Sequence, residues 1–414
     1  MNKVRNLIFS VSLAIFLLGP AALWVSQTKL HLDIPSWLTA EDATYLSGSK
    51  QETSVRESLS VEKFQVKELQ GAIEHKLSNY IPAKAMAITE NAAIQRHSIV
   101  LSNFLFNWPC YPTYYGSTRL TYPMQSVIAY LPKTQSASYQ NQWRTFATGL
   151  CKAARRHPEK RFVVYVAGGY YEPSINPAYS LMSRPVRPTD CIDLLRNETA
   201  AIPNIFILGS SYESEEQYYE DFFRTDHHWN INGAMRAYGE MANALGLEKI
   251  SSCGTSVIPG YLFTGSTARF GIDLLEEEVF DCNNTFSYLT ARRSNGVEQS
   301  GANHSSFYNA DPLLKHYCFY DIYYDNLGDC VISGGSGNRS ALLASNSFRG
   351  AIQRPLASSY QSLSVNKQLH PSATVTETLD EQIERAGADD IFFIANPSNL
   401  KVSDEKYWGQ VPLN

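Results

Sequence analysis

Charge is scarce in this sequence, and neither sign dominates. Only 18% of the 414 residues are Asp, Glu, Lys or Arg, and the formal net charge is −5. The lack of a basic excess argues against nucleic acid as a partner. Low charge together with 44% apolar and 12% aromatic residues excludes a disordered, solvating chain. The length therefore suits one large globular domain or two ordinary ones.

Several motifs that are typical of cofactor-binding or metal-binding proteins are also absent. The seven cysteines include no CxxC pair, so the pattern of a zinc site or a thiol redox centre is missing. The glycine-rich residues 334–337 lack the lysine of a phosphate-binding loop and predict a turn. No internal repeat is found, which argues against a solenoid. We therefore expect neither a cofactor nor a metal.

Long apolar runs are rare, but one lies near the N-terminus. Residues 7–25 form an uncharged stretch of about 19 residues, preceded by Lys3 and Arg5. At ~1.5 Å per residue this stretch can cross a bilayer. Positive charge before it predicts a cytoplasmic N-terminus and an exported remainder. We expect residues 1–27 to be a retained signal anchor in the cell membrane. Cleavage near Ala22, which would give a secreted protein, is the alternative.

Export has a consequence for the cysteines. Outside the cytoplasm some of them should form disulfides, and the odd number leaves at least one free. The sequence does not fix which cysteines pair.

The remainder divides into a stalk and a folded domain. Residues 28–60 are polar and without sustained periodicity, as expected of a linker. Residues 61–414 form the predicted domain, beginning with helical apolar spacing over 61–99. Within it, residues 250–320 are rich in Gly, Ser, Asn and aromatics, which indicates an irregular insertion with some antiparallel strands.

Strands and helices alternate through the predicted domain. Short runs of β-branched and aromatic residues predict strands, and amphipathic stretches predict helices. This alternation predicts an α/β domain with a mainly parallel sheet. Strands are expected at 161–167, 204–208, 340–344 and 390–395, and helices at 138–156, 191–198, 231–245 and from 349.

Residues 224–233 carry the strongest chemical signal. Asp226 lies two residues before His228, and Asn230 is the expected N-cap of the following helix. A carboxylate can orient one imidazole nitrogen while the other accepts a proton from a nucleophile. A loop at the entrance to a helix lies at the sheet edge where open α/β folds bind ligands. This pair is therefore a candidate for acid–base catalysis.

Two other interpretations of the same residues remain open. Asp226, His227 and His228 are all good zinc ligands, although adjacent residues rarely point at one ion and no second cluster is present. His227 alone fits a structural role, as a helix cap or a packed core residue.

The segment also resembles a known family. Residues 225–234 read TDHHWNINGA, which resembles the signature of the bacterial DHHW proteins and the TDxHW segment of the alginate O-acetyltransferases. The order His228, Trp229, Asn230 and Gly233 is similar to the block that holds the catalytic histidine of SGNH hydrolases, with Trp229 where proline is usual. This resemblance implies a three-layer α/β/α SGNH-hydrolase-like domain.

The resemblance also implies a position for the nucleophile. In the alginate-type enzymes the Asp–His block precedes the serine, a permuted motif order. Residues 340–351, SALLASNSFRGA, resemble the GDSF-type block, with Ser345 at the Gly position, Asn346 at the Asp position and Ser347 at the nucleophile. A serine on a strand-to-helix turn exposes its Oγ beside a backbone N–H. Ser347 is therefore the predicted nucleophile, and Ser345 its main rival.

Three further residues are candidates for substrate binding. Asn396 follows the last predicted strand and, by resemblance, is a candidate oxyanion donor; a turn or cap is its default role. Arg224 is a candidate for orienting a carboxylated sugar or for an exposed salt bridge. Trp229 is a candidate for stacking on a sugar ring or for packing beside the helix start.

Together these features predict an extracytoplasmic enzyme with a Ser347–His228–Asp226 triad. The resemblance implies acetyl transfer to, or ester cleavage from, a cell-surface or exported polysaccharide. It also implies a membrane-embedded acyl carrier as partner if the reaction is transfer. The sequence leaves transferase and esterase open. The class alternative is an inactive SGNH-like scaffold that binds glycan, which the departures at Ser345 and Asn346 favour.

Overall fold

The computed structural model describes the chain in separate stretches. They are residues 10–11, 70, 90, 94, 121–124, 127–130, 137–168, 186–224, 226–248, 250, 253, 255–263, 277–293, 298–300, 329–369, 375–402 and 405–409. The expected anchor, the stalk and the helical segment 61–99 thus lie outside the described residues, apart from isolated positions. Within the stretches above, no helix is both long and apolar enough to cross a membrane. Residues 119–268 and 273–414 form one compact unit.

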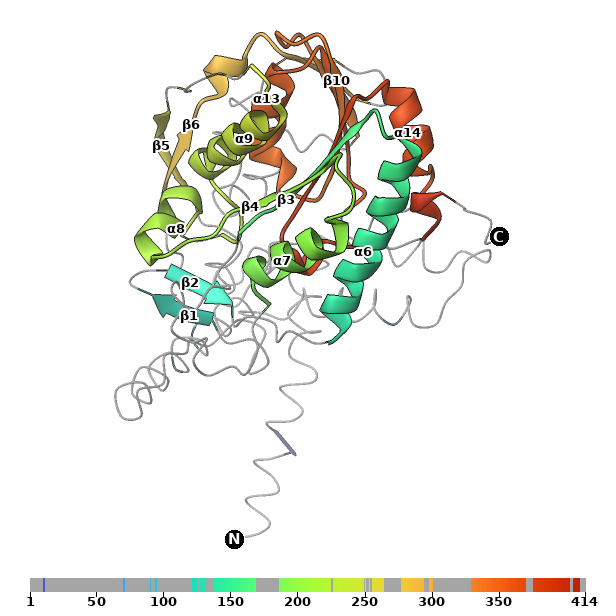
Figure 1. Ribbon diagram of the computed structural model, residues 1–414. Helices are drawn as coiled ribbons and strands as arrows, with labels where there is room; N and C mark the ends of the chain where they lie inside the picture. Colours follow the sequence, from blue (N-terminus) through green and yellow to red (C-terminus); the bar gives the residue numbers. More distant parts are fainter. Residues whose placement is uncertain are drawn as a thin grey trace. The chain divides into compact units, whose positions relative to one another are not determined.

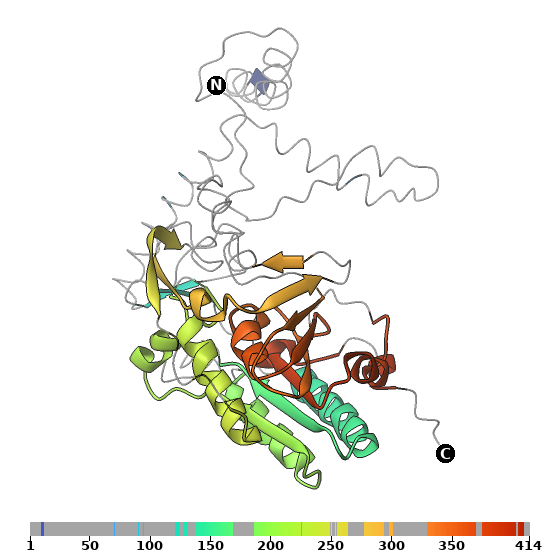
Figure 2. The same cartoon turned by 90° about the horizontal axis from the view of Figure 1, so that it is seen from above.

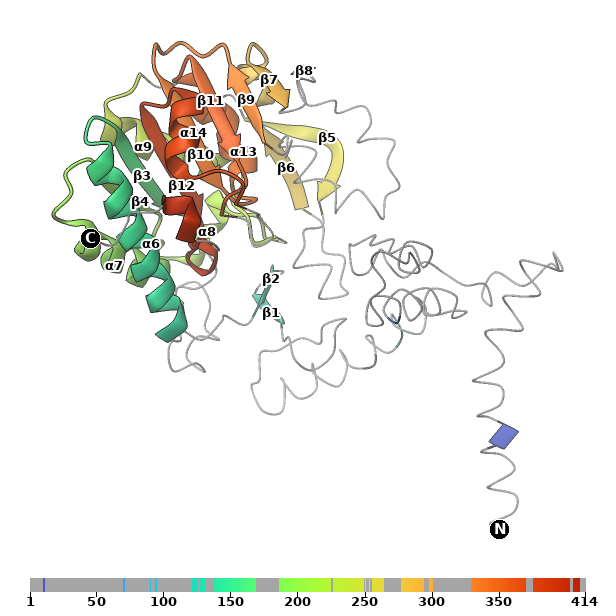
Figure 3. The ribbon, with the colours of Figure 1, turned by 90° about the vertical axis from the view of Figure 1, so that its right-hand side faces the viewer.

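An eight-stranded sheet forms the centre of this unit, in the order β4-β3-β12-β10-β11-β9-β7-β8. Its parallel part consists of β4 (Ile205–Gly209), β3 (Arg161–Val166), β12 (Asp390–Ala395), β10 (Ser340–Ser345) and β11 (Ser362–Asn366). Its antiparallel part consists of β9 (Cys330–Ser333), β7 (Thr290–Arg293) and β8 (Glu298–Ser300). Figure 3 shows β9, β7 and β8 extending the sheet at one side.

Helices cover both faces of the sheet, which gives the three predicted layers (Figures 1 and 2). One face carries α8 (Glu215–Asp221), α9 (Ile231–Leu245) and α13 (Arg349–Ser358). The other carries α6 (Ala137–Arg156), α7 (Pro188–Thr199) and α14 (Leu379–Ala386). The described residues also include short 3₁₀ helices: η3 (Asn283–Phe286), η5 (Pro397–Asn399) and η6 (Glu405–Trp408).

The alternation of side chains along each strand builds two separate cores. In β3, Val163 and Tyr165 pack with α9 and α13, whereas Phe162, Val164 and Val166 pack with α6 and α7. The central parallel strands are buried on both faces, which is why they read as continuous apolar runs in the sequence. The two cores hold the strand ends, and hence any residues placed there, in fixed positions.

The predicted insertion contains antiparallel strands, as expected, and part of it joins the main sheet. β5 (Ser256–Phe263) pairs with β6 (Glu277–Asp281) in a separate two-stranded sheet. β7 and β8, however, pair through β9 with the central sheet. Another two-stranded sheet joins β1 (Thr121–Met124) and β2 (Val127–Tyr130).

A buried carboxylate ties the amino ends of the parallel strands together. Asp390, which is fully buried at the start of β12, accepts two hydrogen bonds of 2.6 Å from Arg161 of β3. It also accepts bonds from Arg339 at 2.9 Å and from the Tyr360 hydroxyl at 2.7 Å. These four hydrogen bonds compensate for part of the cost of desolvating the Asp390 carboxylate. The opposite edge, where the strands end, carries the candidate site.

Candidate active site

The site begins with a short loop that connects α8 to α9. An antiparallel bridge joins Phe222 to Trp229, and the Phe223 N–H donates to the His228 carbonyl at 3.2 Å. The Asn230 N–H donates to the Asp221 carbonyl at 2.7 Å. These bonds close the loop at its base. The backbone hydrogen bonds at the base of the loop therefore hold Asp226 and His228 in place.

The predicted start of α9 is confirmed, and it explains the polar residues of the motif. The Asn230 side chain caps the helix by accepting from the N–H groups of Asn232 and Gly233, at 2.8 and 3.2 Å. A Cβ added at Gly233 would collide with the Asp221 carbonyl oxygen, so glycine allows the helix to approach the loop base. The motif thus fixes the loop geometry as well as supplying acid–base groups.

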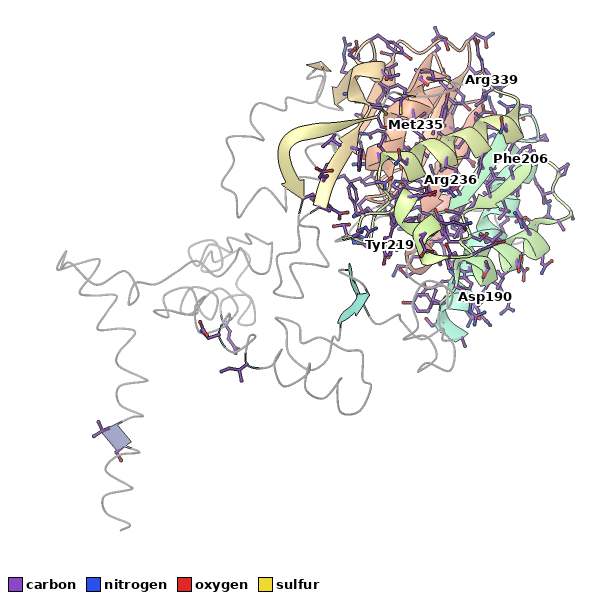
Figure 4. The ribbon with its side chains drawn as sticks, turned by 90° about the vertical axis from the view of Figure 1, so that its left-hand side faces the viewer. Asp190, Phe206, Tyr219, Met235, Arg236 and Arg339 are labelled. Atoms are coloured by element: carbon purple, nitrogen blue, oxygen red, sulfur yellow. The ribbon has the colours of Figure 1, made fainter. Side chains whose placement is uncertain are left out.

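Asp221 provides a further anchor that the sequence did not reveal. Its carboxylate, on a residue only 2% exposed, accepts from the Tyr212 hydroxyl at 2.8 Å and pairs with Arg236 at 2.5 Å. Burial raises the pKa of Asp221, against the lowering effect of Tyr212 and Arg236. Figure 4 labels Arg236 on α9. The network joins the end of α8 to the first turns of α9, on either side of the loop.

The structure brings Asp226, His228 and Ser347 into one line of contacts. Asp226 Oδ1 lies 2.6 Å from His228 Nδ1 and also accepts from the His228 backbone N–H at 3.0 Å. On the other side of the ring, His228 Nε2 lies 2.7 Å from Ser347 Oγ. Asp226 and His228 are 4% and 6% exposed, so the relay is shielded from bulk water. Such an arrangement can move a proton from the hydroxyl to the imidazole.

Ser347 occupies the turn between β10 and α13, as the permuted order predicts. The Asn346 side-chain oxygen accepts from the Phe348 N–H at 3.0 Å, and the Asn346 carbonyl accepts from the Arg349 N–H at 3.2 Å. Asn346, at the position where the GDSF-type block that this segment resembles has Asp, therefore supports the turn with a side-chain acceptor.

The rival Ser345 is engaged elsewhere. Its side chain is fully buried, and its hydroxyl donates to the Ile394 carbonyl of β12 at 2.6 Å. A hydroxyl held in this way links two strands and faces away from solvent. The geometry therefore separates the two serines, with Ser347 beside the imidazole and Ser345 in the sheet.

Of the two roles considered for Trp229, packing beside the helix start is the one that its burial supports. Trp229 is 1% exposed, and its indole N–H donates to the Phe348 carbonyl at 2.9 Å. The rings of Tyr165 and Phe348 pack around it, with centroids 5.9 and 5.5 Å away. Because no ring face is open, Trp229 instead fastens the loop of His228 to the turn of Ser347.

Two groups at the carboxyl ends of the paired strands β10 and β12 are candidates to stabilise an oxyanion. Within the described stretches, the Ser347 backbone N–H has no hydrogen-bond acceptor. Asn396 follows β12, which pairs with the serine-bearing strand β10, and is 7% exposed. Its Oδ1 has no hydrogen-bond partner in the described part of the chain. Rotation of the amide exchanges this oxygen for an N–H donor.

Arg224 lies at the exposed side of the loop. Its backbone N–H donates to Glu277 Oε2 at 2.9 Å, and its guanidinium lies 5.2 Å from the centroid of the Tyr219 ring. Figure 4 labels Tyr219 on α8. These contacts tie Arg224 to α8 and β6. Its role in binding a substrate carboxylate remains a prediction.

The metal interpretation has a geometric basis. Asp226, His227 and His228 each offer a ligand atom, and these atoms lie within 4.8 Å of one another. Both ring nitrogens of His228, however, already face Asp226 and Ser347 at hydrogen-bond distance. A cation held by His228 would therefore displace one of these partners, so the observed contacts fit proton transfer better than metal coordination.

Comparison with solved structures supports the same fold. The chain is similar to a DHHW family protein from Eubacterium siraeum DSM 15702, with a TM-score of 0.51 and 14% identity over 70% of this chain and 94% of the other. It is also similar to Bacillus cereus PatB1 with a sulfonyl adduct, at a TM-score of 0.53 and 16% identity over 69% of this chain and 96% of the other. A second PatB1 structure gives 0.52 and 17%, over 70% and 99%.

No protein-family model and no curated protein sequence matches the chain. The three structures nevertheless confirm the predicted SGNH-like α/β fold and the predicted resemblance to DHHW proteins. At 14 to 17% identity the likeness concerns the fold. The chemistry has to be argued from the residues of this chain.

Proposed function

We propose that this chain is an acyltransferase or esterase that carries an acyl group on Ser347. The observation that supports this most strongly is the contact of His228 Nε2 with Ser347 Oγ at 2.7 Å, with Asp226 Oδ1 at 2.6 Å from the other ring nitrogen. A serine hydroxyl is a weak nucleophile unless a base removes its proton in the attack. The imidazole is in position to be that base.

In the proposed first step, Ser347 Oγ attacks the carbonyl carbon of an ester donor and its proton passes to His228 Nε2. Asp226 holds the ring in the required tautomer and stabilises the imidazolium. The Ser347 N–H, with the Asn396 amide as second donor, stabilises the tetrahedral oxyanion. Collapse of the intermediate expels the donor alcohol, which takes the proton from His228 and leaves acyl-Ser347.

In the second step an acceptor hydroxyl attacks the acyl group while His228 removes its proton. A sugar hydroxyl as acceptor gives transfer, and water gives hydrolysis. The proposed acyl group is acetyl, because residues 225–234 resemble the TDxHW segment of alginate O-acetyltransferases. The proposed acceptor is an exported or cell-surface polysaccharide.

The cellular setting follows from residues 1–27. The apolar run after Lys3 and Arg5 supports a single-pass anchor with the domain outside the cytoplasm. Acetyl donors made in the cytoplasm must cross the membrane to reach such a domain. A membrane-embedded acyl carrier is therefore the proposed partner of a transferase, and residues 61–414 the proposed catalytic domain.

A sulfonyl fluoride should label Ser347. The sulfur of such a reagent is attacked by an activated serine hydroxyl, fluoride leaves, and a stable sulfonyl ester forms. A PatB1 structure contains a sulfonyl adduct, which supports the choice of reagent. We expect one sulfonyl group on the peptide that contains Ser347, found by mass spectrometry, with unchanged labelling in EDTA.

The matched control for labelling is Ser347→Ala, which should remain unmodified under the same conditions. Labelling of Ser345 would contradict Ser347 as the nucleophile. Labelling that a chelator abolishes would favour the metal interpretation.

An inactive glycan-binding scaffold is the second candidate function. Ser345 and Asn346 replace the Gly and Asp of the family block, and this departure favours loss of activity. A scaffold would bind glycan without turnover of any acetyl ester, and Ser347→Ala would leave that binding unchanged.

A further inference from the structure

The DHHW loop, residues 222–230, begins directly after Asp221, the last residue of α8. The Asp221 carbonyl closes the base of this loop by accepting from the Asn230 N–H at 2.7 Å. Asn230 is two residues beyond His228 in the chain. Ser347 belongs to a separate turn, between β10 and α13. A shift of Asp221 would therefore move His228 Nε2 relative to Ser347 Oγ, which lies 2.7 Å from it.

Two side chains from other elements hold the Asp221 carboxylate. The Tyr212 hydroxyl, after β4, donates to Oδ2 at 2.8 Å, and Arg236 of α9 pairs with the same oxygen at 2.5 Å. The Arg236 guanidinium also lies 5.5 Å from the centroid of the Tyr212 ring. The Asp221 side chain is 3% exposed, and that of Arg236 is 40% exposed. One buried carboxylate thus joins the end of α8 to α9 and to the segment after β4.

The charges around Asp221 give Arg236 a particular weight in this cluster. Burial raises the pKa of Asp221, and the contacts with Tyr212 and Arg236 lower it. Glu240 lies one turn further along α9. Burial raises the pKa of Glu240 as well, and both Tyr165 and Arg236 oppose that effect, whereas Asp221 adds to it. Loss of the guanidinium would therefore leave two partly buried carboxylates without the cation that lowers the pKa of both.

We propose that Arg236 is a positioning residue: through the Asp221 carboxylate it holds the DHHW loop where His228 Nε2 meets Ser347 Oγ. This inference rests on the proposed function of Ser347 and adds to it a residue that touches no reacting atom. His228 acts as base in both the acylation and the deacylation step, so both rates depend on where the loop lies. The binding of a small ester does not require the imidazole in that place. Arg236 should therefore act on kcat and leave KM unchanged.

The test is Arg236→Gln in the full-length chain, with the turnover of 4-nitrophenyl acetate measured over a range of ester concentrations. Misplacement of a catalytic group by about 1 Å can cost about 100-fold in rate. We expect kcat to fall about 10- to 100-fold, with KM unchanged. Arg236→Lys should recover most of the lost kcat, because an ammonium group can still pair with the Asp221 carboxylate.

Arg339→Gln is the matched control. Arg339 pairs at 2.9 Å with the buried Asp390, its side chain is 38% exposed, and the Tyr360 hydroxyl donates to the same carboxylate at 2.7 Å. This cluster resembles the one around Asp221 but lies at the amino ends of the strands. Figure 4 labels both arginines. The midpoint of urea unfolding is measured for both variants, and Arg339→Gln should keep the wild-type kcat.

A double-mutant cycle tests whether Arg236 acts through Asp221. In an Asp221→Asn background the charged partner of Arg236 is already lost. Arg236→Gln should then change kcat by less than about twofold, since coupled residues are not additive in their effects. If the two substitutions instead lowered kcat by independent factors, Arg236 would act elsewhere and the proposal would be overturned.

Three other results would also decide against the positioning role. They are a wild-type kcat in Arg236→Gln, an equal loss of kcat in Arg339→Gln, and a rise in KM at constant kcat, which would place Arg236 on the substrate. Failure to find acetyl on Ser347 of the wild-type protein is a different outcome, because it would overturn the proposed function itself.

Discussion

Ser347→Ala is expected to lower the rate of acyl transfer from an acetyl ester by about 10⁴- to 10⁶-fold. Ser347 Oγ is the hydroxyl in contact with His228 Nε2, at 2.7 Å, and alanine leaves the acyl group without a covalent carrier. The measurement is the turnover of 4-nitrophenyl acetate by purified variants. Because the substitution removes one half-buried hydroxyl on a turn, the free energy of unfolding should change by only about 1 kcal/mol.

Ser345→Ala is the matched control for this experiment. Its hydroxyl joins β10 to β12 through Ile394, so its loss should reduce stability by about 1 kcal/mol and leave most of the activity. Ser347→Ala with wild-type turnover, or Ser345→Ala with none, would remove Ser347 from the mechanism.

Asp226→Asn is expected to lower the turnover number by about 10⁴-fold while the fold is retained. Asp226 Oδ1 accepts from both the backbone N–H and Nδ1 of His228, at 3.0 and 2.6 Å. An amide can keep only part of this arrangement. Its N–H group can donate to Nδ1 and so favour the tautomer in which Nε2 carries the proton and cannot act as base. Steady-state kinetics should show the loss mainly in kcat.

Asp193→Asn provides a matched carboxylate-to-amide control, since Asp193 is an exposed residue of α7. It should retain wild-type kinetics. An Asp226→Asn variant that keeps more than about a tenth of the wild-type kcat would show that the carboxylate does not orient the base.

The helices and strands that were predicted correctly are those in which the local sequence signals agree with the burial of the residues in the fold. α9 begins and ends where Asn230 and Gly246 indicate, with Gly246 at φ +64°. β12 occupies the expected residues 390–395, because DIFFIA is buried on both faces and reads as an uninterrupted apolar run. In these segments burial and backbone propensity favour the same structure.

Two elements were not predicted from the sequence: β11, which lacks this agreement, and α14, whose local signals are clear. β11, with the sequence SLSVN, is buried despite its polar residues, because β10 and β9 flank it. Its strand character comes from its neighbours rather than from its composition. α14 is short, but its capping box of Thr378 and Glu381 and its terminal Gly387 were present in the sequence as helix signals.

The candidate site shows the same division. The pair of Asp226 and His228 was predicted from a local motif, and Ser347 was predicted from the resemblance to the permuted alginate-type order. The packing of α8 against α9 determines the burial of Trp229 and the contact of Asp221 with Arg236. No local sequence pattern predicts either feature. The sequence therefore predicted the candidate triad better than it predicted the residues that support it.

The most direct test of the central claim is to trap the acyl-enzyme. The full-length protein is mixed with 4-nitrophenyl acetate, quenched in acid within the first turnover, digested and mapped by mass spectrometry. We predict one acetyl group on Ser347, and none on this peptide in Ser347→Ala. Turnover of the ester without acetyl on Ser347, or acetyl on another residue that forms and decays at the rate of turnover, would contradict the account.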